Sequence, residues 1–169
     1  MSLSPLIVED GSFAFTGGHV VPGANTYINV AYLQQFAADR GVALINDPNI
    51  LILKSMDYIE TVNFVGEKWT RDQVLQWPRI NVFIDGWYQN LETIPFYLLK
   101  GQAMVCLAID EGNGPLIDIP RETSSEEIGN IKVTYKNGSA PLPIVRTINR
   151  WLFKIMAGGN GTNFKIKRA

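Results

Sequence analysis

Hydrophobic residues recur at helical spacing early in the chain and predict two helices there. The first covers about residues 30–40, where Asn29 can act as the N-cap by accepting a hydrogen bond from the first turn. The second begins after Asp47, with Pro48 at the first helical position, and ends near residues 63–66. Apolar residues of this second helix fall on more than one side, so we expect it to be buried between other elements.

Three further helices are predicted in the remainder of the chain. A short helix over residues 70–76 is followed by Pro78, which disfavours helical geometry for the residue before it. A long apolar helix runs from about residue 94 to a stop at Gly112. A last helix begins around residues 141–144 and carries one apolar stripe toward residue 157.

Strand patterns are shorter. An aromatic connection over residues 81–90 has Asp85-Gly86 as turn residues between two short runs. Apolar and polar residues alternate over 131–135, which predicts a half-buried strand within a β-ribbon over residues 122–137. Residues 6–28 contain several glycines and a proline and are expected to be extended or looped.

Together these elements predict a mainly α fold, a small helical bundle from which one β-ribbon projects. A single domain is expected over residues 1–157, since a chain of this length supports one ordinary core. Residues 158–169 are rich in glycine and basic residues, so we expect a flexible C-terminal tail.

Composition adds a hint of assembly. The 169-residue chain has 15 Lys plus Arg against 16 Asp plus Glu, so it lacks an overall electrostatic preference for nucleic acid or an anionic membrane. Charged residues make up 18% and hydrophobic residues 46%. This balance indicates that another copy or a partner covers part of the apolar surface.

The cysteine content and the N-terminal sequence bear on the compartment. Cys106 is the sole cysteine, so no disulfide can form within the chain and a reducing compartment is expected. Residues 1–5 lack the basic start of a signal peptide, and no run of about 18 apolar residues occurs. We therefore expect a soluble protein made in a cytoplasm.

Residues suited to catalysis are few. With one histidine, His19, and one cysteine, the chain lacks the partners of a catalytic triad or a zinc site. Cys106 lies at helical spacing with apolar neighbours, which favours a core position. The acidic pairs Glu9-Asp10 and Glu126-Glu127 consist of adjacent residues, which point apart. The sequence therefore predicts no enzyme, no cofactor and no metal.

Aromatic residues interleaved with bases leave single-stranded nucleic acid open as a ligand. The candidates are Trp69, Arg71, Trp77, Arg79, Trp87 and Tyr88. Near-zero net charge favours the other interpretation, in which these aromatics pack helix ends and loops. A further set of basic residues recurs every four positions and should share one face of the last helix: Arg146, Arg150 and Lys154. This face is either solvated, or it contacts the groove of an acidic partner, or it lines a DNA channel.

The order and spacing of several landmarks resemble one family over nearly the whole chain. The landmarks are residues 6–11, 23–28, 56–59, 64–68, 73–79, 94–95 and 128–135. In this arrangement the chain is similar to the head–tail connector, or adaptor, proteins of tailed phages. That group includes sequences labelled as DnaT-like single-stranded-DNA-binding proteins. A longer loop over residues 13–21 and the glycine-rich basic tail depart from the family pattern.

The resemblance implies a structural protein of the virion neck, made in the host cytoplasm. Such proteins assemble as a ring, commonly a dodecamer, beneath the portal protein. The ring extends the channel through which double-stranded DNA passes without sequence specificity, and it docks a tail-proximal neck or tail-terminator protein. The competing function is single-stranded-DNA binding, as the family label has it.

Two contact surfaces follow as hypotheses from this interpretation. A portal-facing contact is assigned to the tail, where apolar and basic residues alternate in a way that suits strand addition: Phe164, Lys165, Ile166, Lys167 and Arg168. A contact between subunits is assigned to three residues of the ribbon and to one arginine: Lys132, Thr134, Lys136 and Arg79.

Overall fold

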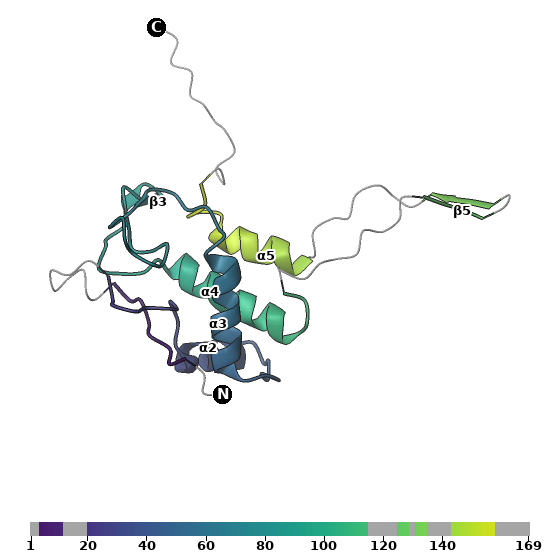
Figure 1. Ribbon diagram of the computed structural model, residues 1–169, viewed down its shortest axis with the longest axis horizontal. Coiled ribbons are helices and arrows are strands. Elements are labelled where there is room, and N and C mark those ends of the chain that lie inside the picture. Colours follow the sequence, from purple (N-terminus) through teal and green to yellow (C-terminus); the bar gives the residue numbers. More distant parts are fainter. Residues whose placement is uncertain (1–3, 12–19, 115–124, 129–130, 135–142, 158–169) are drawn as a thin grey trace, which may run out of the picture.

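The computed structural model of the protein describes residues 4–11, 20–114, 125–128, 131–134 and 143–157 (Figure 1). Four helices lie within these ranges: α2 (Val30–Ala38), α3 (Pro48–Ile59), α4 (Phe96–Asp110) and α5 (Pro143–Leu152). Short strands form three antiparallel pairs: β1 (Glu67–Lys68) with β2 (Arg79–Ile80), β3 (Phe83–Ile84) with β4 (Trp87–Tyr88), and β5 (Ser125–Ile128) with β6 (Ile131–Thr134). The prediction of a mostly helical fold is confirmed, with long loops between the helices.

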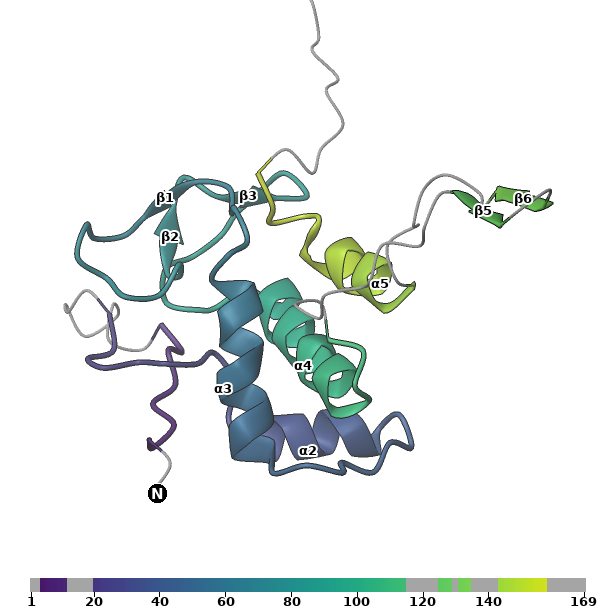
Figure 2. The same cartoon turned by 45° about the vertical axis from the view of Figure 1, so that its right-hand side comes forward.

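Helix α4 is at the centre of the arrangement and contacts the other three helices. Figure 2 shows α3 and α4 side by side, with α2 crossing near one end of both. Helix α5 packs on α4 near its other end. No described helix is long and apolar enough to cross a membrane.

Local signals set the helix starts as the sequence predicts. Asn29 caps α2 by accepting a hydrogen bond from the Tyr32 N–H at 2.8 Å, and Asp47 caps α3 through the Asn49 N–H at 2.8 Å. Helix α3 is shorter than predicted and ends at Ile59, because the next residues turn back toward the core. Helix α4 starts after Pro95, which is its N-cap residue.

The core consists of two clusters of buried side chains that meet along α4. One cluster joins α3, α4 and α5 to the loops, and its largest fully buried members are Trp77, Ile59, Leu98, Ile148, Leu152 and Ile155. The other joins α2, α3 and α4 and includes Leu33, Leu51, Ile52 and Cys106. Cys106 thus occupies a core position, as predicted.

A buried polar network ties the N-terminal region to α3 and α4. The Gln102 side chain accepts a hydrogen bond from the Tyr27 N–H at 3.1 Å and donates to Thr26 Oγ1 at 2.9 Å and Ser55 Oγ at 3.1 Å. Both Gln102 and Ser55 have no exposed surface. A buried polar group is tolerated where its partners are supplied, so this network fixes how residues 26–27 cross the helices.

Residues 70–76 do not form the short helix that the sequence predicts, and the chain makes turns and bends there. The buried Gln73 side chain explains the difference. It accepts a hydrogen bond from the Thr70 N–H at 3.0 Å and donates to the carbonyl oxygens of Leu75 and Pro78 at 2.8 and 3.1 Å. These bonds satisfy backbone groups of the non-helical segment from its own side chain.

Two of the strand pairs differ in their surroundings. The β3–β4 hairpin turns through Asp85 and Gly86, which both have positive φ angles of 54° and 87°, as an Asp-Gly hairpin turn requires. In contrast, β5 and β6, which we call the ribbon, contact only each other among the described elements, and Figures 1 and 2 show them well apart from the helices. The predicted β-ribbon over residues 122–137 is represented by this strand pair, and its residues 122–124, 129–130 and 135–137 lie outside the described ranges.

Candidate functional site

The segment 63–79, which we call the corner, is organised by one arginine side chain. All five N–H donors of the Arg79 guanidinium group find an oxygen acceptor within the same chain. Nε donates to Val65 O at 2.7 Å, Nη1 to Gln76 O and Oε1 at 3.3 and 3.0 Å, and Nη2 to Phe64 O and Gly66 O at 3.2 and 2.7 Å. Arg79 thereby joins the end of α3 to β2.

Burial of this cation has an electrostatic consequence. Arg79 is 9% exposed, and desolvation lowers the pKa of its guanidinium group, while the nearby carboxylates of Glu60 and Glu67 oppose the shift. The charge is satisfied by carbonyl dipoles instead of a paired carboxylate at contact distance. Because every donor of Arg79 is used internally, it is not part of the interface that we propose below.

Tyr27 links the corner to the helices. Its hydroxyl group donates to Glu60 Oε1 at 2.7 Å and accepts a hydrogen bond from the Trp77 N–H at 3.2 Å. The Trp77 ring is 1% exposed and packs edge-on against Phe64, with 6.0 Å between ring centroids. The Trp77–Pro78 peptide bond is cis. The expectation that Trp77 buries its ring is therefore confirmed.

The corner also binds the chain that follows α5. The Val65 N–H donates to Ile155 O at 2.9 Å, and the Ala157 N–H donates to Asn63 O at 2.8 Å. These bonds run antiparallel on either side of a bridge between Phe64 and Met156. The corner therefore joins the chain that follows α3 to the chain that follows α5.

A small cavity of about 200 Å³ lies beside the corner. It is lined mainly by apolar residues of the segment 20–24, by Trp77 and by Glu9. Glu9 is 1% exposed, and desolvation raises the pKa of its carboxyl group despite hydrogen bonds from the N–H groups of Gly11 and Val21.

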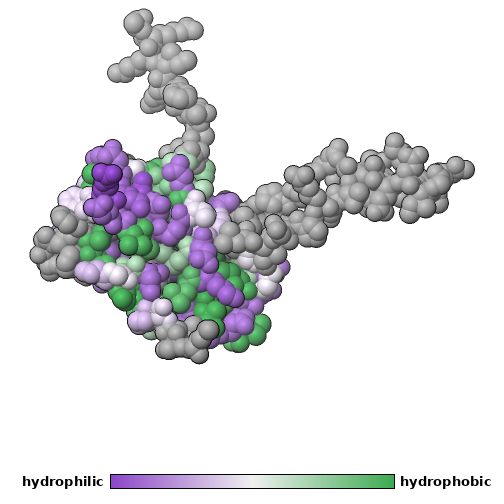
Figure 3. Space-filling view, viewed as in Figure 1, coloured by the Kyte–Doolittle hydropathy of each residue, from purple (hydrophilic) through white to green (hydrophobic). Residues whose placement is uncertain are grey.

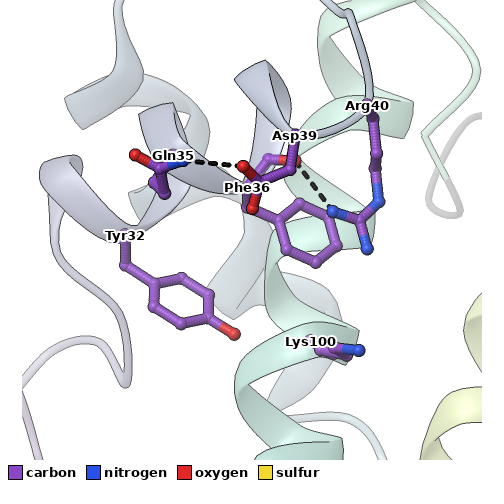
Figure 4. Close-up of a pocket in the computed structure, with 6 residues that line it drawn as sticks. All are labelled: Tyr32, Gln35, Phe36, Asp39, Arg40 and Lys100. Atoms are coloured by element: carbon purple, nitrogen blue, oxygen red, sulfur yellow. Dashed lines mark hydrogen bonds between the residues drawn. The ribbon is translucent and has the colours of Figure 1, made fainter.

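A second cavity is an open groove of about 420 Å³ between α2 and α4 (Figure 4). Tyr32, Gln35, Phe36, Asp39, Arg40 and Lys100 line this cationic groove. The Tyr32 and Phe36 rings stack with 6.2 Å between centroids, and the Arg40 guanidinium carbon lies 3.4 Å from the Phe36 centroid. Arg40 Nη1 also donates to Phe36 O at 2.8 Å, so its position is fixed.

Aromatic rings extend the groove along α4 and α5. Lys100 Nζ lies 4.2 Å from the ring centroid of Phe96 and 4.6 Å from that of Trp151. These two rings meet edge-to-face at 6.5 Å between centroids. Such contacts attract a cation to the ring faces and hold it in place. Lys100 therefore connects the cationic groove to a neighbouring aromatic pair.

The charges of the groove are unbalanced. Asp39 accepts a hydrogen bond from Gln35 at 2.6 Å, as Figure 4 shows. Within the described ranges, neither Arg40 nor Lys100 forms an ion pair with a carboxylate. The groove thus contains two cations held by aromatic rings and one carboxylate, that of Asp39.

A second surface is the β3–β4 hairpin, which we call the aromatic hairpin. Its side chains are unusually exposed for large hydrophobic residues, at 63% for Phe83, 80% for Trp87 and 56% for Tyr88. Phe83 and Tyr88 pair across the strands with ring centroids 5.6 Å apart. An ion pair of 2.6 Å between Asp85 and Lys154 ties the hairpin turn to the chain after α5. Exposed aromatics of this kind mark contact surfaces.

The six aromatic and basic candidates for nucleic-acid binding do not form one patch. Trp77 and Arg79 are buried in the corner, where neither can stack on a base. Trp87 and Tyr88 are exposed on the aromatic hairpin, and Arg71 is exposed in the corner. Of the basic set Arg146, Arg150 and Lys154, Arg150 is exposed on α5, and Lys154 lies just after α5 and is paired with Asp85. The Arg146 side chain lies outside the described part.

The residues assigned to assembly contacts are placed only in part. Lys132 and Thr134 belong to β6, where their register partners in β5 are Glu127 and Ser125. Lys136 and the tail residues 164–168 lie outside the described ranges.

The cationic groove was not among the sites predicted from sequence. Tyr32, Phe36 and Arg40 recur every four residues, which is a signal that a row of side chains shares one face. Lys100 and Trp151 lie close to that row only because of how α4 and α5 pack. The sequence carries no local signal for this packing.

Cys106 is buried in the core. Burial raises the pKa of the Cys106 thiol to about 12, so it is not a nucleophile near neutral pH. No group of three His, Cys, Asp or Glu side chains capable of holding a metal occurs among the described residues.

Comparison with known protein families identifies the family of this chain. The family described as "Putative DnaT-like ssDNA binding protein" matches residues 4–169, and the protein belongs to this family. No curated protein and no solved structure matches the chain.

Proposed function

We propose that this protein is a structural subunit of the virion neck of a tailed phage. In this proposal copies of the small helical domain form a closed ring beneath the portal protein. The ring extends the channel for double-stranded DNA and docks a tail-proximal neck or tail-terminator protein. The resemblance of the sequence landmarks to head–tail connectors is the starting point for this proposal.

The single observation that carries the proposal is the isolation of the ribbon. An isolated two-stranded hairpin is marginally stable in water, and such hairpins normally pack on a third strand or a helix. Here β5 and β6 contact no other described element of their own chain. A ribbon of this kind is accounted for if another molecule supplies the missing packing, and in a ring the neighbouring subunit does so.

The surface supports the same proposal. The aromatic hairpin exposes three large apolar side chains, and further apolar residues such as Ile45 and Val74 are 80% and 76% exposed. Figure 3 shows hydrophobic patches separated by hydrophilic areas on the face in view. Exposed apolar patches combined with near-zero net charge permit close association between copies, and a repeated contact between unlike surfaces can close a ring.

The test is to image the purified protein alone and mixed with its portal protein by negative-stain electron microscopy. We expect closed rings, either free or seated on the portal. The matched variant replaces residues 125–134 with a short Gly-Ser linker. Because the ribbon has no contact with the described helices, this variant should keep the thermal midpoint of unfolding and lose the rings. Rings that persist without the ribbon would remove the observation on which the proposal depends.

In the same proposal, the tail residues 164–168 bind the portal, and Lys132, Thr134 and Lys136 lie at the contact between subunits. Deleting residues 158–169 should weaken portal binding without preventing ring formation. Portal binding that is unchanged by this deletion would exclude the tail from the portal contact.

A second candidate function is binding of single-stranded DNA. The cationic groove favours it, since cations beside aromatic rings suit phosphates and bases, and the family description names the same ligand. The test is to titrate a fluorescent oligonucleotide at several salt concentrations. Genuine binding should weaken steeply with salt and be lost in the Arg40→Gln and Lys100→Gln variants. Equal binding by these variants and the wild type would exclude the groove.

A further inference from the structure

We infer that the cationic groove of one subunit receives strand β5 of a neighbouring copy. This inference rests on the proposed ring and assigns its two unlike contact surfaces. The groove supplies two cations beside aromatic rings, and β5 supplies acidic residues on a ribbon that its own chain leaves unpacked.

The groove side is preorganised. Arg40 is held between the Phe36 ring and the Phe36 carbonyl oxygen, and Lys100 is held between the rings of Phe96 and Trp151. Because both cations are fixed before a partner arrives, little side-chain entropy remains to be lost on binding. Within the described chain neither cation forms an ion pair with a carboxylate, and Asp39, which lines the same groove, is held by the Gln35 side chain instead.

The ribbon side has the complementary charge. Strand β5 carries two acidic residues, Glu126 and Glu127, and no basic residue. In the ribbon, Glu127 is the register partner of Lys132, but Glu126 is the partner of Val133. In this register no basic residue stands opposite Glu126, and the apolar Ile128 follows two positions further along β5.

The two surfaces belong to different copies. Figures 1 and 2 show the ribbon apart from α2 and α4, and no contact joins β5 to either helix. When two unlike patches of a chain bind each other between copies, the contact is head-to-tail, and repeating it closes a ring if the rotation permits.

Zero-length cross-linking tests the contact directly in the full chain. A carbodiimide joins an amine to a carboxylate only when they touch, so it should couple Lys100 to Glu126 or Glu127. Assembling equal amounts of light and nitrogen-15-labelled protein identifies the copies, because a link between subunits gives peptides with one light and one heavy half. We expect mixed pairs at this site. Links confined to a single copy, or assembled rings without any such link, would overturn the inference while leaving the ring itself in place.

Reversing the charges on either side of the proposed contact tests how much the contact contributes to self-association. The Arg40→Glu/Lys100→Glu variant and the Glu126→Lys/Glu127→Lys variant should each weaken self-association roughly tenfold or more, measured by sedimentation. Mixing the two variants should restore it, because their surfaces are again complementary. The control is Lys54→Glu/Arg71→Glu, which reverses two exposed cations elsewhere and should have little effect.

The remaining outcomes separate this inference from its alternatives. If the groove variant assembles like the wild type but loses oligonucleotide binding, the groove is a nucleic-acid site and the inference is wrong. If the wild type forms no ring, alone or on the portal, the proposed function fails and the inference falls with it.

Discussion

Tyr27 and Glu60 share a hydrogen bond of 2.7 Å between the tyrosine hydroxyl group and the glutamate Oε1, at the point where the N-terminal segment reaches the end of α3. The same hydroxyl oxygen accepts the Trp77 N–H, so one tyrosine connects three distant segments. Desolvation raises the pKa of Glu60, although the hydrogen bond from Tyr27 and nearby cations oppose the shift.

Glu60→Gln should alter the pH dependence of stability. The folded protein binds the proton of Glu60 more tightly than the unfolded chain, whose pKa is 4.5. This contribution to stability is therefore complete below that value and is lost as the pH rises through the higher pKa of the folded state. Glutamine keeps an acceptor for Tyr27 and does not titrate. Urea titrations measure the free energy of unfolding of both proteins, and the value of the variant minus that of the wild type should increase between pH 4 and pH 7. A difference that stays constant over this pH range would contradict the account.

Arg79→Lys should destabilise the protein by about 2 kcal/mol or more, even though the positive charge is kept. A lysine has three donors on one nitrogen and cannot reach the acceptors on both sides of the corner, so buried carbonyl groups lose their partners. Chemical denaturation measures the loss. Arg71→Lys, at an exposed position of the same segment, is the control and should be nearly neutral. Equal effects of the two substitutions would mean that the network of Arg79 contributes little.

Gly66→Ala should be far more damaging than Gly86→Ala. Both glycines have positive φ angles, 72° and 87°, so alanine costs roughly 1 kcal/mol at either position for backbone reasons alone. A methyl group at Gly66 would also collide with the carbonyl oxygen of Ile80, whereas nothing lies within 4 Å at Gly86. We expect a total loss of roughly 3 kcal/mol at Gly66. Similar thermal midpoints for the two variants would show that the corner can relax around the added atom.

Gln102→Leu should cost roughly 1–3 kcal/mol, because it leaves the buried Tyr27 N–H without its acceptor and removes the donor to Thr26 and Ser55. Gln34→Leu on the exposed side of α2 is the matched control and should be close to neutral. Hydrogen exchange of the Tyr27 amide gives a second measure, and it should become faster in the Gln102 variant. An amide that stays equally protected would contradict the assigned role of Gln102.

Much of the fold could be predicted from the sequence because its signals are local. Asn29 and Asp47 are N-caps and Asp85-Gly86 is a hairpin turn, and each of these depends on a few neighbouring residues. The helix predicted over residues 70–76 was wrong because Gln73 is drawn into the core and pairs with the backbone of its own segment. That outcome depends on the burial of Gln73, which local propensity does not report.

The surfaces were harder to predict than the elements. Arg79 was assigned to a contact between subunits, but the carbonyl oxygens of residues 64–66 turn toward its guanidinium group in the folded chain. Lys100 and Trp151 come together only when α4 and α5 pack, so no spacing in the sequence reveals them. The ribbon was predicted from alternation over residues 131–135, since that pattern is local.

Cryo-electron microscopy of the intact virus particle tests the central claim most directly. A reconstruction of the neck should contain this protein as a closed ring between the portal and the first tail-proximal protein, with each ribbon packed on the neighbouring subunit. A neck in which this chain is absent, in particles produced by the same virus, would contradict the proposed function.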